Sequence, residues 1–485
     1  MSDLFTLFIT PLIISAAAFL LPFLFRSTYG KIVAVALSLI PLALLIYGQP
    51  HWIGTSVSYK WLPPLGINFH LAVDSLSLVF LYLTAIIIPI SFLALPKEGI
   101  VSSNTFYGMV FLLQGLLIGF FTARDLVVFT IFWESMLLPL FFIISYWGGA
   151  KRRAAALKFL VYMIAGSTLM VIGVLALHFA TLQATGTSTF GFDLLGKTAE
   201  TAPHAGWLFF IFLLAFCVKT PLFPFHGWLP DAYCQASTSG TILLSAILSK
   251  AGIYGIVRIG LGFFPTFMVE WGHLLLGLAI VGVFYGGLSA WVQNDFKRLI
   301  AYSSFSHVNF ILVGLFVANQ IAHEGAVLQA LNHGVTIAAL FLVAGWLEER
   351  IGSTAISRFS GAAKYLPHLC WLTLFFVLSS VALPGTNNFI GEFMILFGLF
   401  TTNPLLTAVL GLSVILSVIY MLRWMQKVYF GTPHLVEGIG RDIGWREISI
   451  ALPLVFLVLW VGVYPTPVLN QILNTVRDTI VLETP

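Results

Sequence analysis

Apolar segments of about 20 residues recur along almost the whole chain, and each is long enough to cross the hydrocarbon core of a bilayer as a helix. Only 9% of the 485 residues are charged and 59% are hydrophobic. A soluble domain carries about 25% charged residues, so the surplus apolar surface must face lipid. The sequence therefore excludes a soluble globular domain and predicts an all-α polytopic membrane protein.

We expect about fourteen transmembrane helices in a single membrane domain that comprises residues 1–485. The predicted spans lie near 4–25, 32–48, 74–95, 106–122, 125–146, 156–182, 207–224, 238–263, 271–293, 298–318, 325–347, 366–400 (broken), 404–430 and 446–468. No Ser/Gly-rich linker or block of charge divides them. The first stretch lacks a basic n-region and a small-residue cleavage site, so it is expected to be retained as a span.

The distribution of Lys and Arg over the loops predicts the orientation. One set of alternate loops contains most of the basic residues: Arg26, Lys31, Lys97, Lys151, Arg152, Arg153, Lys158, Lys297, Arg298, Arg350, Arg358, Lys364, Lys427, Arg441 and Arg446, with Arg423 at the membrane edge. The opposite set contains only Lys60, Arg124, Lys197 and Arg477. Because cytoplasmic loops are enriched in Lys and Arg, both termini are predicted to lie outside, with a bacterial inner membrane as the expected location.

Two groups of five predicted helices follow one another in the middle of the chain. The expected divisions are N-terminal helices in 1–95, a first repeat in 106–263, a second repeat in 271–430, and a C-terminal helix and tail in 446–485. Because five is odd, the second repeat is expected to be inserted upside down relative to the first. The sequence thus predicts two inverted five-helix repeats.

The fourth helix of each predicted repeat contains prolines. Pro221 and Pro224 interrupt one, and Pro384 with Gly385 interrupts the other. Proline removes a backbone donor and clashes with the preceding turn, so both helices are expected to be broken. Paired broken helices in inverted repeats are the usual pointer to a transport path.

Four ionisable residues lie inside these apolar stretches: Glu134, Lys219, Lys250 and Glu392. A charge at the bilayer centre costs roughly 2.5–3.5 kcal/mol on insertion scales, so an ion or proton path is the default interpretation. Glu134 and Lys219 are expected to interact. A lysine can gain or lose a proton there, whereas an arginine cannot. A structural ion pair is the alternative.

Two histidines, His307 and His333, lie in the predicted tenth and eleventh helices, between Lys250 and Glu392 in chain order. The pKa range of histidine suits proton transfer at neutral pH, so we consider both as possible relays, with a satisfied core histidine as the alternative. For Glu392, the alternative is a packing residue beside the break. Arg258, nearer a helix end, is expected to snorkel toward the membrane surface.

Other motifs are less specific. His226 and Asp231 follow the seventh helix on a loop, where a proton entry or an ordinary turn both fit. The three cysteines, Cys217, Cys234 and Cys370, have no metal-ligand spacing. The sequence has no GxGxxG motif, P-loop, cysteine cluster or histidine pair with haem spacing. We therefore expect no redox cofactor and no metal site in this chain.

Three segments resemble the antiporter-like subunits of proton-pumping NADH–quinone oxidoreductase, respiratory complex I. They are Phe132–Glu134 (FWE), Lys219–Ala232 (KTPLFPFHGWLPDA) and Asn294–Ser304 (NDFKRLIAYSS). The resemblance covers nearly the whole chain. Lysine in the broken twelfth helix is typical of the chain L branch, and glutamate is typical of chain M. Glu392, within Phe389–Phe393 (FIGEF), is therefore similar to the chain M branch.

The chain departs from the family pattern at four positions. Tyr233 replaces the usual histidine, Gln235 a glutamate and Ser237 a proline, and Asn309 stands where glycine is usual. These departures affect the expected roles of the loops and leave the four membrane charges unchanged.

The resemblance implies a proton-translocating subunit of the membrane arm, with Glu134, Lys219, Lys250 and Glu392 transferring protons. NADH, FMN, iron–sulfur clusters and quinone would bind to partner subunits. The expected partners are the other membrane-arm and peripheral-arm subunits, the lipid bilayer and protons, without nucleic acid. The alternatives are a cation/proton antiporter of an Mrp-type complex, a membrane subunit of an energy-converting hydrogenase or related complex, and a structural scaffold.

Overall fold

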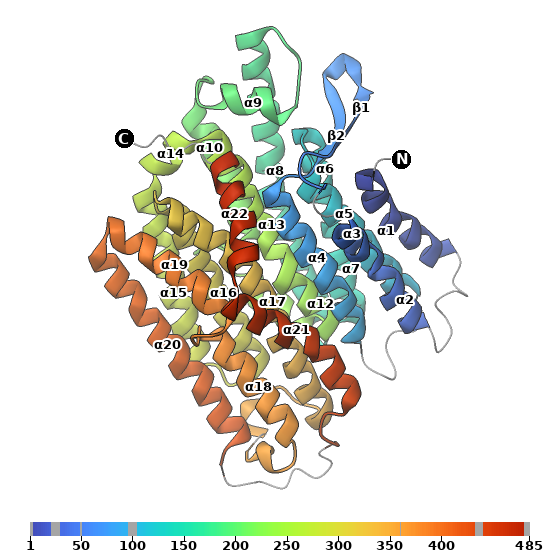
Figure 1. Cartoon of the computed structure of the whole chain (residues 1–485), viewed down its shortest axis with the longest axis vertical. Helices are drawn as coiled ribbons and strands as arrows, with labels where there is room; N and C mark the ends of the chain where they lie inside the picture. Colours follow the sequence, from blue (N-terminus) through green and yellow to red (C-terminus); the bar gives the residue numbers. More distant parts are fainter. Residues whose placement is uncertain are drawn as a thin grey trace.

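The chain folds into a bundle of helices that run roughly along its long axis (Figure 1). This computed structural model describes residues 3–20, 30–48, 51–95, 104–358, 360–431 and 440–479. Both ends of the chain lie toward the same end of the bundle, together with a hairpin and the short helix α9. The all-α polytopic fold predicted from the sequence is confirmed.

The N-terminal part contributes three spans and a hairpin. The helices are α1 (Asp3–Leu20), α2 (Gly30–Ser38) with α3 (Ile40–Tyr47), and α4 (Ser75–Leu93). The antiparallel strands β1 (Ser56–Leu62) and β2 (Ile67–Ala72) are joined by the 3₁₀ turn η2 (Pro63–Leu65). Gly66 follows at φ +73°, and an added Cβ would lie 2.1 Å from the Ser188 carbonyl oxygen, so only glycine fits here. The hairpin was not predicted.

The next part contains the first expected group of five spans. Its elements are α5 (Asn104–Thr122), α6 (Leu126–Ser135) with α7 (Leu137–Trp147), α8 (Arg152–Thr185), the short α9 (Phe192–Ala199), α10 (Ala205–Lys219) with α11 (Leu229–Gln235), and a span from Thr238 to Leu261. That span comprises α12 (Thr238–Leu243), η3 (Leu244–Leu248), α13 (Ser249–Gly255) and η4 (Ile256–Leu261), of which η3 and η4 are π-helical.

The second group and the C-terminal part follow. They comprise α14 (Pro265–Glu270), α15 (Gly272–Trp291), α16 (Phe296–Phe316), α17 (Gln320–Ile351), η5 (Ile356–Arg358), η6 (Ala362–Lys364), α18 (Pro367–Ser380), α19 (Asn387–Thr402), α20 (Pro404–Tyr429), α21 (Trp445–Val463) and α22 (Thr466–Thr479). Within the described residues, twelve helical segments are long and apolar enough to cross a membrane. The two interrupted spans, α10 with α11 and α18 with α19, bring the number to the predicted fourteen.

Several predicted boundaries were wrong. The spans predicted over 156–182 and 325–347 are the longer helices α8 and α17, which extend three to five residues further at each end. The seventh span was expected to run over 207–224, but α10 ends at Lys219 because Pro221 cannot continue the hydrogen-bonded ladder. The last span was expected over 446–468, but α21 ends at Val463, just before Pro465, and α22 continues the chain.

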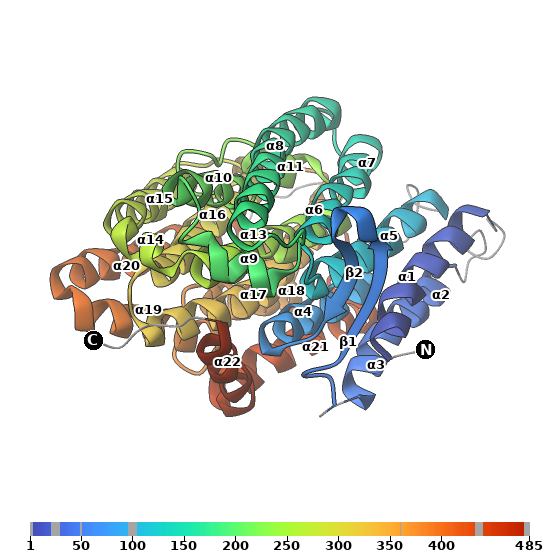
Figure 2. The same ribbon diagram turned by 90° about the horizontal axis from the view of Figure 1, so that it is seen from above.

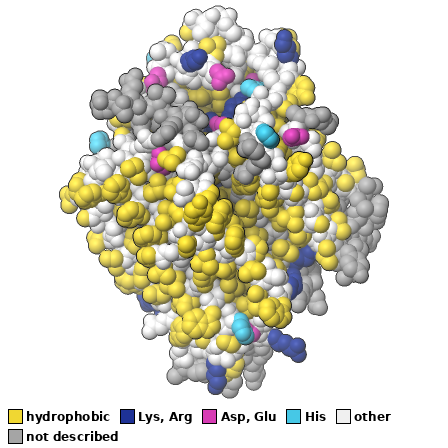
Figure 3. Space-filling view, viewed as in Figure 1, with side chains coloured by type: hydrophobic (Ala, Val, Ile, Leu, Met, Phe, Trp, Pro, Cys, Tyr) yellow, Lys and Arg dark blue, Asp and Glu magenta, His cyan; other side chains and the backbone are white. Residues whose placement is uncertain are grey.

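Three central spans form the core, and the more lipid-exposed helices surround them (Figure 2). The span Thr238–Leu261 is buried throughout, and α16 and α17 are almost as deeply buried. In contrast, α1, α2 with α3, α20 and α21 each expose most of their side chains. On the face shown in Figure 3, hydrophobic side chains cover the middle, and charged side chains gather toward the two ends. The central helices carry Lys250, His307 and His333, so the bundle encloses these residues.

Candidate functional site: a buried row of ionisable side chains

Lys219 is the last residue of α10 and lies at the break before α11. Its side chain is 1% exposed. The Nζ donates to the Trp133 carbonyl oxygen at 3.2 Å and lies 3.3 Å from the centroid of the Trp133 ring. An aromatic face attracts a cation, so Trp133 can hold a charged Lys219 away from water.

Glu134 follows Trp133 on α6, close to the end of that helix. Helix α6 ends at Ser135, four residues before Pro139, whose ring excludes the regular hydrogen bond. The Glu134 side chain is half-buried beside Ser167 of α8. It interacts electrostatically with Lys219, but among the described residues the two form no direct ion pair within 4.0 Å. The structure therefore brings the two predicted residues together with Trp133 between them.

Lys250 lies on α13, directly after the π-helical segment η3, and is completely buried. Its Nζ lies 2.7 Å from the Ser245 carbonyl oxygen, 3.3 Å from Ser249 Oγ and 2.8 Å from His333 Nδ1. The wider π-turn supports a contact that reaches back five residues to Ser245. Lys250 and His333 are therefore in direct hydrogen-bond contact.

Helices α10 and α13 approach closely at the first break. An added Cβ on Gly252 would lie 1.9 Å from Thr220 Oγ1, so no larger residue fits there without displacement. Thr220 Oγ1 in turn donates to the Ser249 carbonyl oxygen at 3.2 Å. This contact links the backbone next to Lys219 with the backbone next to Lys250.

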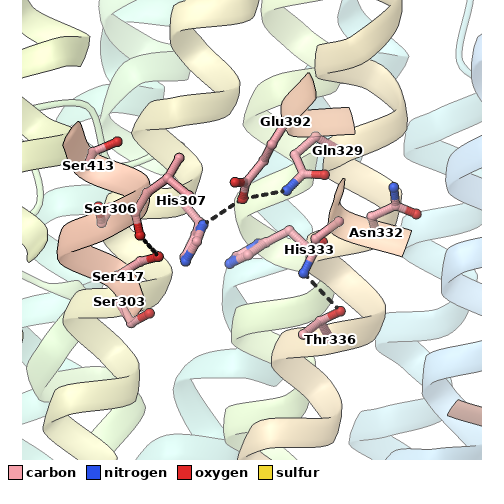
Figure 4. Close-up of polar contacts among 12 residues, drawn as sticks. Ser303, Ser306, His307, Gln329, Asn332, His333, Thr336, Glu392, Ser413 and Ser417 are labelled. Atoms are coloured by element: carbon pink, nitrogen blue, oxygen red, sulfur yellow. Dashed lines mark hydrogen bonds and ion pairs between the residues drawn. The ribbon is translucent and has the colours of Figure 1, made fainter. Parts of the chain in front are cut away.

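His333 on α17 and His307 on α16 continue the row toward α19. Their ring centroids lie 5.9 Å apart. His307 Nδ1 lies 3.1 Å from Glu392 Oε1, and Gln329 Nε2 donates to the same oxygen at 3.2 Å (Figure 4). Both histidines and Glu392 are buried. The predicted relay residues therefore lie in space between Lys250 and Glu392, as they do in chain order.

The buried Nε2 atoms of His307 and His333 have no hydrogen-bond partner in the described part of the chain. Buried polar atoms in proteins are almost always paired with protein or water. In Figure 4 the two rings face one another across the space between α16 and α17. The hydrogen-bonded row is therefore interrupted between His333 and His307, and we call the space between these two unpaired nitrogen atoms the polar gap.

The second break, between α18 and α19, is held by side-chain amides. Asn332 Nδ2 donates to the Asn387 carbonyl oxygen at 2.7 Å, and Asn387 Nδ2 donates back to the Asn332 carbonyl oxygen at 3.1 Å. Asn388 Nδ2 donates to the Ser379 carbonyl oxygen at 2.9 Å. These bonds link the start of α19, the helix that carries Glu392, to α17 and α18.

An amide also holds the first break. Asn309 Nδ2 donates to the Pro221 carbonyl oxygen at 3.0 Å and to the Phe305 carbonyl oxygen at 2.9 Å. Asn309, which stands where the family usually has glycine, therefore links α16 to the interrupted helix through this hydrogen bond. Of the other departures, Gln235 accepts a hydrogen bond from the Lys151 amide, and Ser237 caps α12.

The expectation that Arg258 snorkels was wrong. Its guanidinium is buried and pairs with Asp74 Oδ2 at 2.7 Å, and Arg124 pairs with the same oxygen at 2.8 Å. Asp74 precedes α4, and Arg124 precedes α6. This cluster joins the N-terminal helices to the first group of spans. Its residues are far apart in sequence, so no local pattern indicated the contact.

His226, on the turn before α11, and Asp231, which lies within α11 and not on a loop, do not join the row. Asp231 pairs with Lys158 at 2.7 Å and with Arg298 at 3.4 Å, and so bridges α8 and α16. The His226 ring packs 4.4 Å from that of Phe305. Both residues therefore make ordinary ion-pair and packing contacts.

Sequence reasoning missed Gln329, Asn332 and the two asparagines of α19. The available signal was two amide side chains in a mainly apolar segment, Gln329 one turn before His333 and Asn332 directly before it. Among the described residues, no group of three or more His, Cys, Asp or Glu side chains is arranged to hold a metal ion.

Comparisons with known proteins agree with this geometry. The family model described as "NADH:quinone oxidoreductase/Mrp antiporter, TM" matches residues 123–436. NADH-quinone oxidoreductase subunit M of Pseudomonas aeruginosa is 39% identical over 433 residues, which cover 87% of this chain and 84% of that protein. F(420)H(2) dehydrogenase subunit M of Methanosarcina mazei is 37% identical over 422 residues, covering 86% and 85%.

A chain of respiratory complex I from Thermus thermophilus with bound NADH has the same fold. It superposes with a TM-score of 0.86 at 30% identity, over 98% of this chain and 99% of that chain. The family model covers more than half of the sequence, and the Pseudomonas relative is matched over most of its length. The chain therefore belongs to the NADH:quinone oxidoreductase/Mrp antiporter family of membrane subunits.

Proposed function

We propose that this chain is the proton-translocating subunit M of a membrane-bound NADH:quinone oxidoreductase. The observation that carries the proposal is the buried row that leads from Lys250 through His333 and His307 to Glu392, with Lys219 and Glu134 at its other end. Subunit M proteins from P. aeruginosa and Escherichia coli are 39% and 37% identical to it. The chain couples electron transfer in partner subunits to proton movement across the membrane.

Lys219 acts as the switch in this proposal. The Trp133 ring and carbonyl oxygen favour the charged ammonium, and burial opposes it. A change in position or charge of Glu134 shifts this balance, because the two groups interact electrostatically without a fixed ion pair. Lysine can release its proton in response, whereas arginine would stay charged.

The proton then moves along hydrogen-bonded groups. Lys250 Nζ and His333 Nδ1 are 2.8 Å apart, which is within direct transfer distance. An imidazole accepts a proton on one nitrogen and releases one from the other, so His333 can pass a proton toward His307. His307 is in contact with Glu392, the last group of the row. The gap between the two Nε2 atoms requires a bridging water.

The chain itself holds no redox centre in this proposal. NADH, FMN, iron–sulfur clusters and quinone bind to partner subunits of the membrane and peripheral arms. What this chain supplies is a set of proton-carrying side chains in a bundle that excludes bulk water.

The proposal also includes the orientation and the internal symmetry. The residues 106–263 and 271–430 form two inverted five-helix repeats, each with one interrupted span: α10 with α11 in the first and α18 with α19 in the second. Both termini face the outside, since the basic loops lie at the opposite end of the bundle. A cysteine placed in the β1–β2 hairpin is expected to react with an impermeant thiol reagent added outside intact cells.

A related complex with another electron donor is the second candidate. The observation that favours it is the 37% identity to F(420)H(2) dehydrogenase subunit M over most of both chains. The proton path would be the same, because the donor would bind to other subunits. The Mrp-type antiporter has less support, since the relatives reported above are subunits M of dehydrogenases.

Purification of the tagged chain in mild detergent tests the function. Flavin and iron–sulfur subunits that co-purify with NADH:quinone activity are expected. Co-purification with a dehydrogenase that oxidises a different donor would favour the second candidate. Only small hydrophobic partners, together with sodium-dependent exchange that needs no NADH, would contradict the proposal.

A further inference from the structure

A surface groove of ≈ 690 Å³ lies at one end of the bundle, between the ends of α15 and α20 and beside α18. Its walls include Trp291, Leu374, Ile419, Arg423, Gln426 and Lys427. The groove is at the end of the bundle that carries most of the basic loops, and its residues take no part in the hydrogen bonds of the row of ionisable residues.

The basic residues of the groove lack acidic partners among the described residues. Arg423 and Lys427 are one turn apart on α20 and both are exposed. Neither forms an ion pair within the part of the chain that the structure describes. By contrast, Lys297 at the same end pairs with Glu348, and Arg350 pairs with Glu447 at 3.2 Å. The groove therefore presents two uncompensated positive charges side by side.

The walls of the groove combine polar and apolar side chains along α20, with Phe430 beyond Lys427 at the end of the helix. Gln426 and Lys427 lie near the helix end, and Ile419 and Leu422 lie one to two turns deeper toward the middle of the bundle. The Arg423 guanidinium lies 6.0 Å from the centroid of the Trp291 ring. Tryptophan at this depth is typical of the level of lipid headgroups. A ligand that fits has an anionic head and an apolar tail.

We propose that this groove binds an anionic phospholipid. The phosphate contacts Arg423 and Lys427, Gln426 donates to a headgroup oxygen, and one acyl chain lies along Ile419 and Leu422. The two unpaired cations and the apolar residues deeper along α20 support this ligand independently of the proposed proton path.

Photo-crosslinking tests the proposal. The complex that contains this chain is purified, stripped of lipid with detergent, and incubated with phosphatidylglycerol or phosphatidylcholine that carries a photoreactive acyl chain. Mass spectrometry then identifies the labelled peptides. We expect saturable labelling of α20 by phosphatidylglycerol only. The double variant Arg423→Gln/Lys427→Gln should weaken this labelling about tenfold or more, because two cations near the phosphate are removed.

Two controls separate the headgroup contact from misfolding and from general charge. Arg423→Lys keeps the charge and should keep the labelling. Arg153→Gln removes an exposed basic residue in the first turn of α8 and should change nothing. Equal labelling by phosphatidylcholine, displacement of the lipid by glycerol phosphate, or crosslinks from α20 to a partner subunit in place of lipid would each overturn the proposal.

Discussion

His333 connects the two ends of the buried row, because it contacts Lys250 directly and faces His307 across the polar gap. Replacing it with alanine removes the only side chain seen between those two residues in the described structure. We expect His333→Ala to lower NADH-driven proton pumping about tenfold or more, as expected when a positioned proton carrier is lost. Proton uptake by vesicles measures the pumping.

The matched control is His178→Gln, which replaces a buried histidine on α8 outside the row. Equal pumping by the wild type and His333→Ala would contradict the relay.

Lys219 tests whether a titratable charge or merely a positive charge is needed beside Trp133. Lys219→Arg keeps the cation over the ring but cannot release its proton at neutral pH. We expect this variant to pump as poorly as Lys219→Ala, with a loss of about tenfold or more. If arginine restored pumping while alanine abolished it, Lys219 would serve as a static charge. Both variants should assemble, which subunit composition after purification checks.

At the level of elements, the Asp74 cluster fixes α4 against α6 and the end of η4. Asp74→Asn would leave Arg124 and Arg258 close together and without their shared counter-charge. Removing one partner of a buried ion pair costs about 3–5 kcal/mol, and somewhat less here because the Asp74 side chain is 30% exposed. We expect a lower thermal midpoint for the purified complex. Asp193→Asn, an exposed acid on α9, should leave the midpoint unchanged, and equal effects of the two variants would argue against the cluster.

Asp442 gives an element-scale prediction about pH, because it accepts hydrogen bonds at the start of α18. Burial raises the pKa of this carboxyl, but bonds from the His368 and Ile443 amides and the His368 ring outweigh it and leave the pKa below its usual value. The depressed pKa means that Asp442 stabilises the folded state above about pH 4 and that this is lost as the pH falls further. Amide exchange at His368 and Leu369, corrected for intrinsic rates, should accelerate in that range. Asp442→Asn should show no such pH dependence.

The sequence predicted the elements that depend on local chemistry better than those that depend on distant contacts. The breaks after Lys219 and before Asn387 could be predicted because proline acts on its own helix. The β1–β2 hairpin was missed because it lies outside the apolar spans, although the turn residues Pro63–Gly66 were a usable signal. The asparagine bonds between α17 and α19 join residues 55 apart and left no local pattern.

For the whole molecule, the chain order correctly placed both histidines between Lys250 and Glu392, but their order in space is reversed, because His333 contacts Lys250 and His307 contacts Glu392. Lys250, His333, His307 and Glu392 come from four neighbouring helices, and apolar periodicity together with loop charge was enough to place those helices. The half-buried position of Glu134 could not be predicted, because exposure depends on which helices cover α6. The Asp74–Arg258 contact, 184 residues apart, could not be predicted either.

In the proposed function, electron transfer in partner subunits is coupled to proton movement through this row. The most direct test compares wild-type complex and Lys250→Met complex in sealed vesicles, with NADH oxidation and proton uptake recorded together. Lys60→Met, an exposed lysine on β1, is the matched control. We predict that Lys250→Met loses most proton uptake while Lys60→Met behaves as wild type. If the Lys250→Met complex took up as many protons per NADH oxidised as the wild type, and oxidised NADH at the same rate, the proposed coupling through Lys250 would be contradicted.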